Sequence, residues 1–307
     1  MNLYITSGDP AGCGPAITLS ALQTLTLPAD LDITLIGERE IYRRNPGFDS
    51  IAGRVRLLDT ATSGIGRIRF GTVSSITGRS ALRGLETACE LLKKKPGRLV
   101  TAPLSKEAVQ QVSPGFRGHT EYLAGQFSAA RYAMLMKSPA FSTVLFTRHI
   151  PARLVPQRIQ PGPVRETLEL IHRFFLAQDG IETPRIGIAA LNPHAGIDTY
   201  LGKEERVIME AVSGLPFQVE GPYPADTIFM HRDRYDCILA MYHDQGMIPF
   251  KLLAFREGVN MTIGLPFIRT SPAHGVALDL MRNGIDPDPA SMKAAIHCAL
   301  SANPIVK

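Results

Sequence analysis

The chain has 307 residues, 45% of them hydrophobic and 20% charged, and its formal net charge is +5. This composition is typical of a globular protein, and no apolar stretch approaches the ~20 residues that a membrane-spanning helix needs. The positive charge is small and scattered, which argues against a nucleic-acid-binding protein; the basic run Lys93 to Lys95 ends a predicted helix, where cations are favoured.

Short apolar runs rich in Ile, Leu, Val or Met predict buried strands. They cover residues 3–7, 32–36, 98–102, 132–137, 142–147, 185–191 and 236–242. Between several of them, apolar residues recur near every 3.6 positions, over 81–92 and 164–175, which predicts amphipathic helices. The alternation predicts an α/β fold with mostly parallel sheets, and the length favours two lobes. Gly and Pro clusters predict turns or domain crossings at 45–47, 113–118, 161–163 and 284–289.

The amino terminus, MNLYITSGDP, lacks the basic region and long apolar region of a signal peptide, so we expect a cytoplasmic protein. The four cysteines, Cys13, Cys89, Cys237 and Cys298, are widely spaced and form no CxxC pair. This spacing predicts neither a disulfide framework nor a thiolate zinc site.

Polar segments follow several of the predicted strands: SGDPAGCGP, TAPLSK, LNPHAG and MYHDQG. In open α/β sheets, ligands bind beyond the carboxyl ends of the strands, so these segments are candidates for a functional site. The glycines of the first segment do not match a dinucleotide or phosphate-loop fingerprint. That segment predicts a tight strand-to-helix turn whose amide groups could meet an anion.

His119, His149, His194 and His243 all lie in turns or at strand ends. A single histidine in such a place is more often a hydrogen-bonded structural residue than a metal ligand. Three neutral imidazoles from separate strand ends would, however, leave open positions on a divalent metal, as a catalytic site requires. No HExxH or other local metal signature is present, so both interpretations stay open.

Acidic and cationic side chains add to this pattern. Asp226 and Asp244 could orient a metal-bound histidine, hold a water or accept a proton, or could simply cap turns. Lys251, Asn260 and Arg269 suit a phosphate or carboxylate, although Lys251 could equally extend into solvent. These residues predict an α/β enzyme that acts on a small anionic substrate with a metal.

The motifs together resemble the 4-hydroxythreonine-4-phosphate dehydrogenase family of vitamin B6 biosynthesis, in order and nearly end to end. They are SGDPAGCGP, TAPLSKEA, GHTEYLA, LNPHAG, PADTIF, MYHDQG, KLLAF, GVNMTIGLPFIRTS and HG at 274–275. The most specific feature is the combination of YHDQG with GVNMTIGLPFIRTS, and the resemblance is weakest from about 38 to 75.

The resemblance implies a homodimer of chains with two α/β lobes similar to isocitrate dehydrogenase, with the active site in the interlobe cleft near the dimer contact. We expect a first lobe of residues 1–115 and 265–307, and a second lobe of residues 116–264 that carries the metal histidines and the dimer contact. The resemblance also implies one divalent metal ion, which could be zinc, magnesium, cobalt or manganese. One of its ligands would come from the other chain of the dimer. The implied metal ligands are His149, His194 and His243.

Further residue roles are implied by the same motifs. The implied substrate contacts are His119, Thr120, Lys251, Asn260 and Arg269. The implied catalytic residues are Asp226, Asp244 and Lys251. The implied cofactor contacts are Asn192, Gly196, Gly202, His274 and Gly275.

The implied reaction is NAD-dependent oxidation of the C3 hydroxyl of 4-phosphohydroxy-L-threonine. The β-keto acid formed then loses carbon dioxide to give 3-amino-2-oxopropyl phosphate. In this reaction Lys251 and Arg269 would anchor the phosphate, and Asp226, before Asp244, would take the hydroxyl proton.

The sequence also departs from the family's usual pattern. The departures are Ala16, Asp198, Thr199, Ala273, Val276 and the segment MRNG at 281–284. Several of them fall where the family's cofactor would lie. An acid at Asp198 near the ribose would repel the 2′-phosphate of NADP, so we favour NAD while NADP stays possible.

Other functions stay open. The same site could oxidise 4-phospho-D-threonate or 4-phospho-D-erythronate in sugar-acid catabolism, because the visible motifs do not bind the amine. A phospho-ligand-binding protein without dehydrogenase activity and a phosphate acyltransferase of similar fold are the further alternatives.

Overall fold

The computed structural model describes residues 1–45, 47–196 and 202–303. They form two compact units. Unit 1 comprises Met1–Ser128 and Phe267–Ser301, and unit 2 comprises Ala129–Pro266 with the described residues after Ser301. Among the described residues, no helix combines the length and the apolar character needed to cross a membrane.

The unit boundaries differ from the expected lobes of 1–115 with 265–307 and of 116–264. Residues 116–128, with helix α6 (His119–Gln126), lie in unit 1. The reason is the packing that follows the helix: the Phe127 ring meets the Phe267 ring edge to face at 4.7 Å between centroids. Lys93 Nζ also donates a hydrogen bond to Gln126 Oε1 at 3.2 Å. The Gly- and Pro-rich segment 113–118 is therefore a loop inside unit 1.

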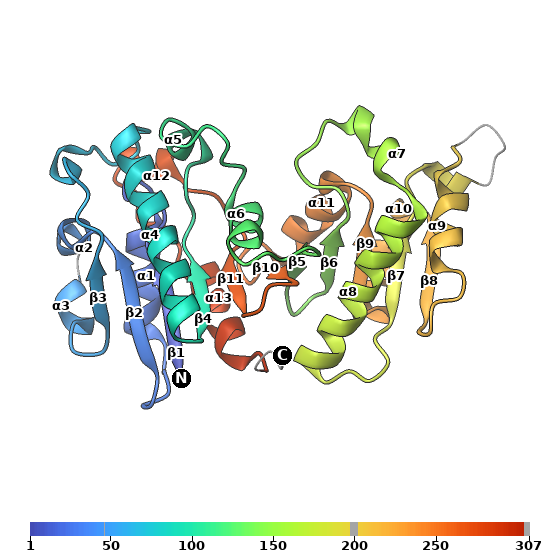
Figure 1. Ribbon diagram of the computed structural model, residues 1–307, viewed down its shortest axis with the longest axis horizontal. Coiled ribbons are helices and arrows are strands. Elements are labelled where there is room, and N and C mark those ends of the chain that lie inside the picture. Colours follow the sequence, from blue (N-terminus) through green and yellow to red (C-terminus); the bar gives the residue numbers. More distant parts are fainter. Residues whose placement is uncertain (46, 197–201, 304–307) are drawn as a thin grey trace. The chain divides into compact units, whose positions relative to one another are not determined.

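Unit 1 is built on a parallel sheet with strand order β3-β2-β1-β4-β11. Its strands are β1 (Asn2–Thr6), β2 (Asp32–Gly37), β3 (Arg56–Asp59), β4 (Arg98–Thr101) and β11 (Arg269–Pro272). Its α-helices besides α6 are α1 (Gly14–Thr24), α2 (Arg39–Arg44), α3 (Phe48–Ile51), α4 (Ser75–Lys94), α5 (Lys106–Gln110), α12 (Leu278–Arg282) and α13 (Ala290–Ser301), with the 3-10 turn η1 (Ile65–Arg67). Helix α4 packs on β1 and β2, while α13 packs on β4 and β11 and against α1 (Figure 1).

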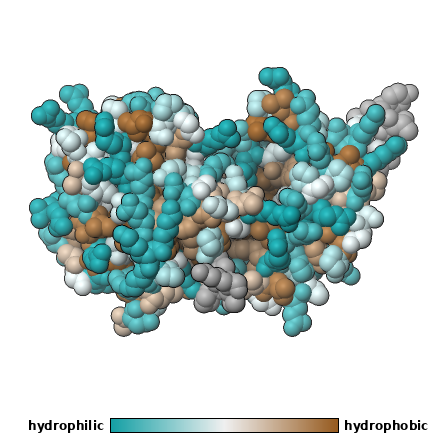
Figure 2. Space-filling view, in the orientation of Figure 1, coloured by the Kyte–Doolittle hydropathy of each residue, from teal (hydrophilic) through white to brown (hydrophobic). Residues whose placement is uncertain are grey.

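Helix α4 shows how the local sequence sets an element of unit 1. Ser74 and Thr77 form a capping box at its start, and Lys93 and Lys94 lie in its last turn. Its outward face is charged, and hydrophilic side chains run along it in the space-filling view (Figure 2). Leu85 and Ala88 on the opposite face are buried, so the helix covers the sheet with its apolar face.

Unit 2 has strand order β10-β5-β6-β9-β7-β8, in which β5 runs antiparallel to β10 and β6, and the remaining pairs are parallel. Its strands are β5 (Ala133–Lys137), β6 (Ser142–Leu145), β7 (Ile186–Ala189), β8 (Val219–Tyr223), β9 (Cys237–Ala240) and β10 (Val259–Ile263). Its helices are α7 (Val155–Arg158), α8 (Pro161–Asp179), α9 (Glu204–Val212), α10 (Ala225–Ile228) and α11 (His243–Ala254), with the 3-10 turns η2 (Ala152–Leu154), η3 (Pro193–Gly196) and η4 (Phe229–Arg234).

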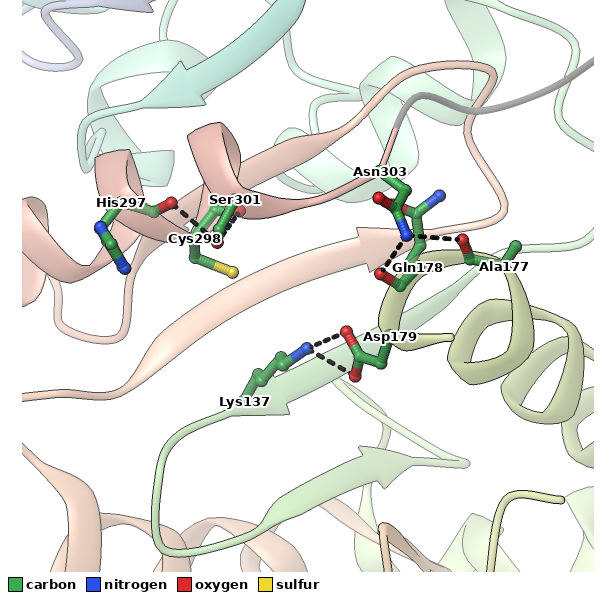
Figure 3. Close-up of polar contacts among 8 residues, drawn as sticks. All are labelled: Lys137, Ala177, Gln178, Asp179, His297, Cys298, Ser301 and Asn303. Atoms are coloured by element: carbon green, nitrogen blue, oxygen red, sulfur yellow. Dashed lines mark hydrogen bonds and ion pairs between the residues drawn. The ribbon is translucent and has the colours of Figure 1, made fainter. Parts of the chain in front are cut away.

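The end of α8 in unit 2 is held by two polar contacts (Figure 3). Lys137 Nζ of β5 pairs with both carboxylate oxygens of Asp179, at 2.6 and 2.7 Å. Asn303 Nδ2 donates to the carbonyl oxygens of Ala177 and Gln178, at 3.4 and 3.0 Å. The last carbonyl groups of a helix lack partners within the helix, so Asn303 satisfies groups that would otherwise depend on water.

The α/β fold with mostly parallel sheets is confirmed, and every strand predicted from an apolar run is present. Strands β3, β8, β10 and β11 were not predicted. Of these, β11 reads Arg-Thr-Ser-Pro and contains no large apolar residue at all. Its side chains are nevertheless buried, which hydropathy alone does not reveal.

The turn after β1 contains a buried carboxyl group, Asp9. Its backbone amide donates to Pro103 O at 2.9 Å, and its Oδ1 accepts a hydrogen bond from the Ala11 amide at 2.9 Å. Burial raises the pKa of Asp9 to about 6, against the smaller lowering effect of hydrogen bonds such as that from Ala11. The folded protein therefore holds a proton on Asp9 more tightly than the unfolded chain does.

Replacing Asp9 with asparagine should make the stability of the protein less dependent on pH. Because the pKa of Asp9 is raised from 3.8 to about 6, its contribution to the free energy of unfolding is fully present below pH 3.8 and is lost as the pH rises through about 6. At about 1.4 kcal/mol per pKa unit, the loss is about 3 kcal/mol. The free energy of unfolding can be measured with urea at pH 4 and at pH 7.5. Its change between the two pH values should be smaller in Asp9→Asn than in the parent protein.

The matched control is Asp49→Asn, an exposed acid on α3 of the same unit. It should leave the pH dependence as in the parent protein. An unchanged pH dependence in Asp9→Asn would contradict the role given to this carboxyl group.

Candidate active site

The predicted metal ligands follow neighbouring strands of unit 2. Strand β9 pairs in parallel with β6 on one side and with β7 on the other. His149 follows β6, His194 follows β7, and His243 begins α11 after β9. Since carboxyl ends of parallel strands meet at one edge of a sheet, the strand order directs these segments to the same edge.

Hydrogen bonds link these three segments to one another. Thr147 Oγ1 donates to Met241 O at 2.7 Å, which ties the segment after β6 to the end of β9. Gln245 Oε1 accepts from the Met241 amide at 2.6 Å, and Gln245 Nε2 donates to Ala190 O at 2.7 Å. The buried side chain of Gln245 therefore connects the end of β9 with the end of β7.

Gly246 lets the first turn of α11 lie directly on the sheet. A Cβ atom at this position would lie 2.6 Å from Leu145 Cδ2 and 3.1 Å from Ala240 Cβ, so a side chain here would crowd the side chains of β6 and β9 under the helix. The glycine of the MYHDQG motif thus permits the close packing of the first turn of α11 on both strands.

His149 and His243 share one pocket of about 270 Å³. Their ring centroids are 5.8 Å apart. The pocket is lined by Thr147, Arg148, His149, Ile150, Ala152, Val155, Tyr242, His243 and Asp244. Asp244 Oδ1 lies 2.7 Å from His243 Nδ1, so the carboxylate accepts a hydrogen bond from Nδ1–H. In the neutral imidazole this tautomer leaves the lone pair of Nε2 for a metal. Two imidazoles, one with its tautomer set in this way, have the donor chemistry that a divalent metal needs.

His194 lies in the turn η3 with a left-handed backbone, φ 54° and ψ 23°, which is uncommon for a residue with a side chain. Helix α10, which carries the exposed Asp226, contacts this turn. Within residues 1–45, 47–196 and 202–303 of a single chain, no group of three or more His, Cys, Asp or Glu side chains is arranged to hold a metal. One chain therefore brings His149 and His243 together but does not assemble the full set of three histidines.

Two predicted substrate contacts lie elsewhere in unit 2. Lys251 is exposed on α11. Asn260 lies in β10, and its Oδ1 is buried without a hydrogen-bond partner among the described residues. A buried amide oxygen in this state can accept a hydrogen bond from a ligand.

The other predicted substrate contacts lie in unit 1, around the start of β11. The Arg269 side chain is buried, and its Nε and Nη2 donate to Thr101 Oγ1 at 3.1 and 2.6 Å. Burial lowers the pKa of Arg269 to about 9, an effect that the nearby charge of Glu121 opposes, so the guanidinium stays charged at neutral pH. Thr120 is buried in the first turn of α6.

His119 begins α6, and its Nε2 is buried without a hydrogen-bond partner in the described part of the chain. Burial holds the pKa of His119 well below its usual range, and the charges of Arg269 and Lys106 lower it further. The imidazole is therefore neutral at pH 7. Lys106 and Glu121 were not singled out from the sequence, although both lie in strand-end or turn motifs, TAPLSK and GHTE, that were.

The predicted cofactor contacts form two groups, one in each unit. In unit 2, the backbone amide of Asn192 donates a hydrogen bond to Glu205 Oε1 at 2.8 Å. Gly196 packs against the Glu205 side chain, and Gly202 packs against the Asn192 side chain. Glu205 is buried and was not singled out from the sequence. Its role shows only in the fold, where it accepts hydrogen bonds from the backbone and the side chain of Asn192.

In unit 1, His274 Nδ1 donates to Gly275 O at 2.9 Å, which leaves Nε2 as an acceptor. That atom is buried and has no partner among the described residues, so the site fits a ligand with a hydrogen-bond donor, such as a nucleotide base. Val276 packs directly against Gly12, and the Ala273 amide donates to Ser291 Oγ at 2.9 Å. Two other departures, Asp198 and Thr199, lie outside the described residues.

Comparisons with known proteins agree with the family resemblance. The family described as "Pyridoxal phosphate biosynthetic protein PdxA" matches residues 14–299. A 4-hydroxythreonine-4-phosphate dehydrogenase of Sulfurihydrogenibium sp. is 37% identical, over 98% of this chain and 98% of that protein. A candidate D-threonate 4-phosphate dehydrogenase of Oceanobacillus iheyensis is 36% identical, over 98% of this chain and 97% of that protein.

Among solved structures, the crystal structure of 4-hydroxythreonine-4-phosphate dehydrogenase from Klebsiella pneumoniae superposes with a TM-score of 0.81 at 32% identity, covering 97% of this chain and 98% of that one. The match of motifs, of the whole sequence and of the fold leads to one conclusion. The chain belongs to the pyridoxal phosphate biosynthetic protein PdxA family, a family of dehydrogenases.

Proposed function

We propose that this protein oxidises the C3 hydroxyl of 4-phosphohydroxy-L-threonine with NAD and a divalent metal ion, and that the product loses carbon dioxide to give 3-amino-2-oxopropyl phosphate. The observation that carries the proposal is the pocket beyond β6 and β9. There the ring centroids of His149 and His243 lie 5.8 Å apart, and Asp244 contacts His243. The identity of 37% to a 4-hydroxythreonine-4-phosphate dehydrogenase supports the choice of substrate.

The metal would be held by His149, His194 and His243, and zinc, cobalt, manganese and magnesium all accept imidazole with water or carboxylate ligands to differing degrees. When bound, it supplies a Lewis acid that polarises the substrate hydroxyl and later the carbonyl group. Asp244 orients His243 through the 2.7 Å contact between Oδ1 and Nδ1. Asp226, exposed on α10 next to the turn of His194, is the proposed acceptor of the hydroxyl proton.

The proposed reaction balances in two steps. The C3 hydrogen leaves as hydride to the nicotinamide ring of NAD, and the hydroxyl proton leaves to the base, so C3 becomes a ketone. The bond between C2 and the carboxylate then breaks with release of carbon dioxide, and C2 takes up a proton. Asn192, Gly196, Gly202, His274 and Gly275 are the proposed cofactor contacts. Arg269 and Lys251 are proposed to bind the negatively charged ends of the substrate.

A homodimer with a shared metal site forms part of this proposal. Ile248 and Leu252 on α11, with Phe255 directly after the helix, follow helical spacing and are 60%, 80% and 57% exposed. A cluster of large exposed apolar side chains at one site commonly marks a protein contact. Since one described chain does not assemble a three-ligand metal group, a second copy that covers this face and completes the site would explain both features. Sedimentation analysis of the purified protein tests the dimer.

A second substrate is favoured by one observation. The candidate D-threonate 4-phosphate dehydrogenase of Oceanobacillus iheyensis is nearly as similar, at 36% identity. Oxidation of 4-phospho-D-threonate or 4-phospho-D-erythronate would need the same metal, hydroxyl and phosphate contacts and would differ in the group at C2.

The test is NADH formation by metal-loaded protein with 4-phosphohydroxy-L-threonine and 4-phospho-D-threonate offered in parallel, each beside a chelated control. We expect a higher kcat/KM for the first substrate, lost on chelation, and a higher rate with NAD than with NADP. Preference for the second substrate would move the protein to sugar-acid catabolism. No turnover with either substrate would contradict both assignments.

A further inference from the structure

Unit 1 gathers charged and polar groups from three segments that are far apart in the sequence. Lys106 is the first residue of α5, His119 is the first residue of α6, and Arg269 is the first residue of β11. Both cations act electrostatically on the His119 imidazole. We name Lys106, His119 and Arg269 the unit 1 cationic cluster.

The Lys106 side chain lies over Gly118, the residue before His119. A Cβ atom built on Gly118 would lie 3.4 Å from Lys106 Cε and 3.8 Å from Lys106 Nζ. The same position lies 3.3 Å from Glu121 Oε2, so this carboxylate also faces the cluster. Two cations, one carboxylate and one neutral imidazole leave a net charge of +1.

A bound ligand would give a hydrogen-bond partner to His119 Nε2, which has none among the described residues. His119 Nε2 is buried and lacks a partner in the described chain, and such groups are rare in folded proteins. In the tautomer with its proton on Nε2, the imidazole would donate a hydrogen bond to an anionic oxygen, which would also be attracted by both cations and by the N-terminal end of the α6 dipole. Lys106 is exposed, so a ligand can approach from solvent.

We propose that Lys106 is a substrate-binding residue, whose ammonium acts with the Arg269 guanidinium and His119 Nε2 to bind the phosphate of the substrate. The sequence paired Arg269 with Lys251, which lies in unit 2. Within unit 1, Lys106 lies beside Gly118 at the start of α6, and the charges of Lys106 and Arg269 both act on His119. The inference rests on the proposed function for the phosphorylated hydroxy acid, but binding of phosphate itself does not depend on turnover.

The test compares Lys106→Met with the parent protein in two assays. The first assay titrates inorganic phosphate into the full-length protein by calorimetry, without substrate. The second assay measures kcat and KM for 4-phosphohydroxy-L-threonine. Loss of one charged hydrogen bond to phosphate should weaken phosphate binding by about 10- to 100-fold and raise KM by a similar factor. The kcat should change little, because the phosphate is bound equally before and during reaction at C3.

Three further variants separate binding from a structural role. Lys106→Arg keeps the charge and should keep most of the phosphate affinity. Glu121→Gln removes the nearby carboxylate and should leave phosphate affinity unchanged or higher. If Lys106 served only to pair with Glu121, Glu121→Gln and Lys106→Met would lose phosphate affinity to the same degree. Lys94→Met, an exposed lysine at the end of α4 in the same unit, should have no effect. Thermal unfolding confirms that each variant is folded.

The outcomes also separate this inference from the proposed function. If the parent protein turns over neither substrate yet binds phosphate through Lys106, the proposed function fails and the phosphate site stands. If turnover is normal but Lys106→Met keeps full phosphate affinity and KM, the inference is overturned and the proposed function stands. Absence of phosphate binding by the parent protein would also overturn the inference.

Discussion

Replacing His243 with alanine should reduce metal-dependent NADH formation by at least about 100-fold and should lower the amount of bound metal measured directly after dialysis. The reason is that His243 shares a pocket with His149 and has its tautomer set by Asp244, at 2.7 Å from Nδ1. Even changes to groups that only orient a metal ligand cost about 10- to 100-fold in affinity or activity, and loss of a ligand should cost more. His149→Ala and His194→Ala should behave in the same way.

The control for this result is His231→Ala, an exposed histidine on η4 in the same unit. It should keep its metal and its activity. Full metal content in His243→Ala would contradict the assignment of this residue as a ligand.

Mixing the inactive histidine variants in pairs tests whether two chains share each site. If one ligand comes from the partner chain, a mixed dimer of two variants contains one intact site whenever the two changes fall on different sides of the interface. Random mixing then restores up to about a quarter of the parent activity. Two of the three pairings should recover activity, and the pairing that does not recover identifies the two histidines supplied by the same chain. No recovery in any pairing would mean that each chain supplies all its own ligands.

Replacing Asp226 with asparagine should lower kcat by about 100- to 10,000-fold with little change in KM, because a positioned general base contributes that much to proton transfer. Asp226 is exposed on α10, which contacts the turn carrying His194, so its carboxylate is available to a substrate beside that turn. Steady-state kinetics with saturating metal measure both parameters. Asparagine keeps the size of the side chain but cannot accept a proton as a carboxylate does.

Asp233→Asn provides the matched comparison, since Asp233 is an exposed acid on η4 of the same unit. Its kcat should equal that of the parent protein. Unchanged turnover in Asp226→Asn would remove this residue from the proposed mechanism and make Asp244 the next carboxylate to test.

Strands that are buried on both faces were predictable from the sequence because they must be apolar throughout. Strand β9, with Cys237, Ile238, Leu239 and Ala240 all buried, is an example. Strand β11 was not predictable, because Arg269, Thr270 and Ser271 are polar and yet buried. Their burial depends on partners such as the Thr101 hydroxyl, which the chain reaches only after folding.

The boundary between the units shows the same limit. The Gly- and Pro-rich segment 113–118 has the local composition of a domain crossing, but α6 beyond it stays in unit 1. The contact between Phe127 and Phe267, which accompanies this choice, joins residues from opposite halves of the sequence. Composition describes how easily a chain turns, whereas packing decides to which core the next helix belongs.

The sequence by itself determined the α/β class, the apolar strands and the positions of the histidines just beyond strand ends, since these follow from local periodicity and from the order of residues along the chain. Only the tertiary structure decided which of those side chains meet. The strand order β6-β9-β7 and the close approach allowed by Gly246 bring His149 and His243 into one pocket. In unit 1, the packing of α5, α6 and β11 brings the charges of Lys106 and Arg269 within electrostatic reach of His119. Such contacts between distant segments depend on how sheets and helices pack and not on spacing along the chain.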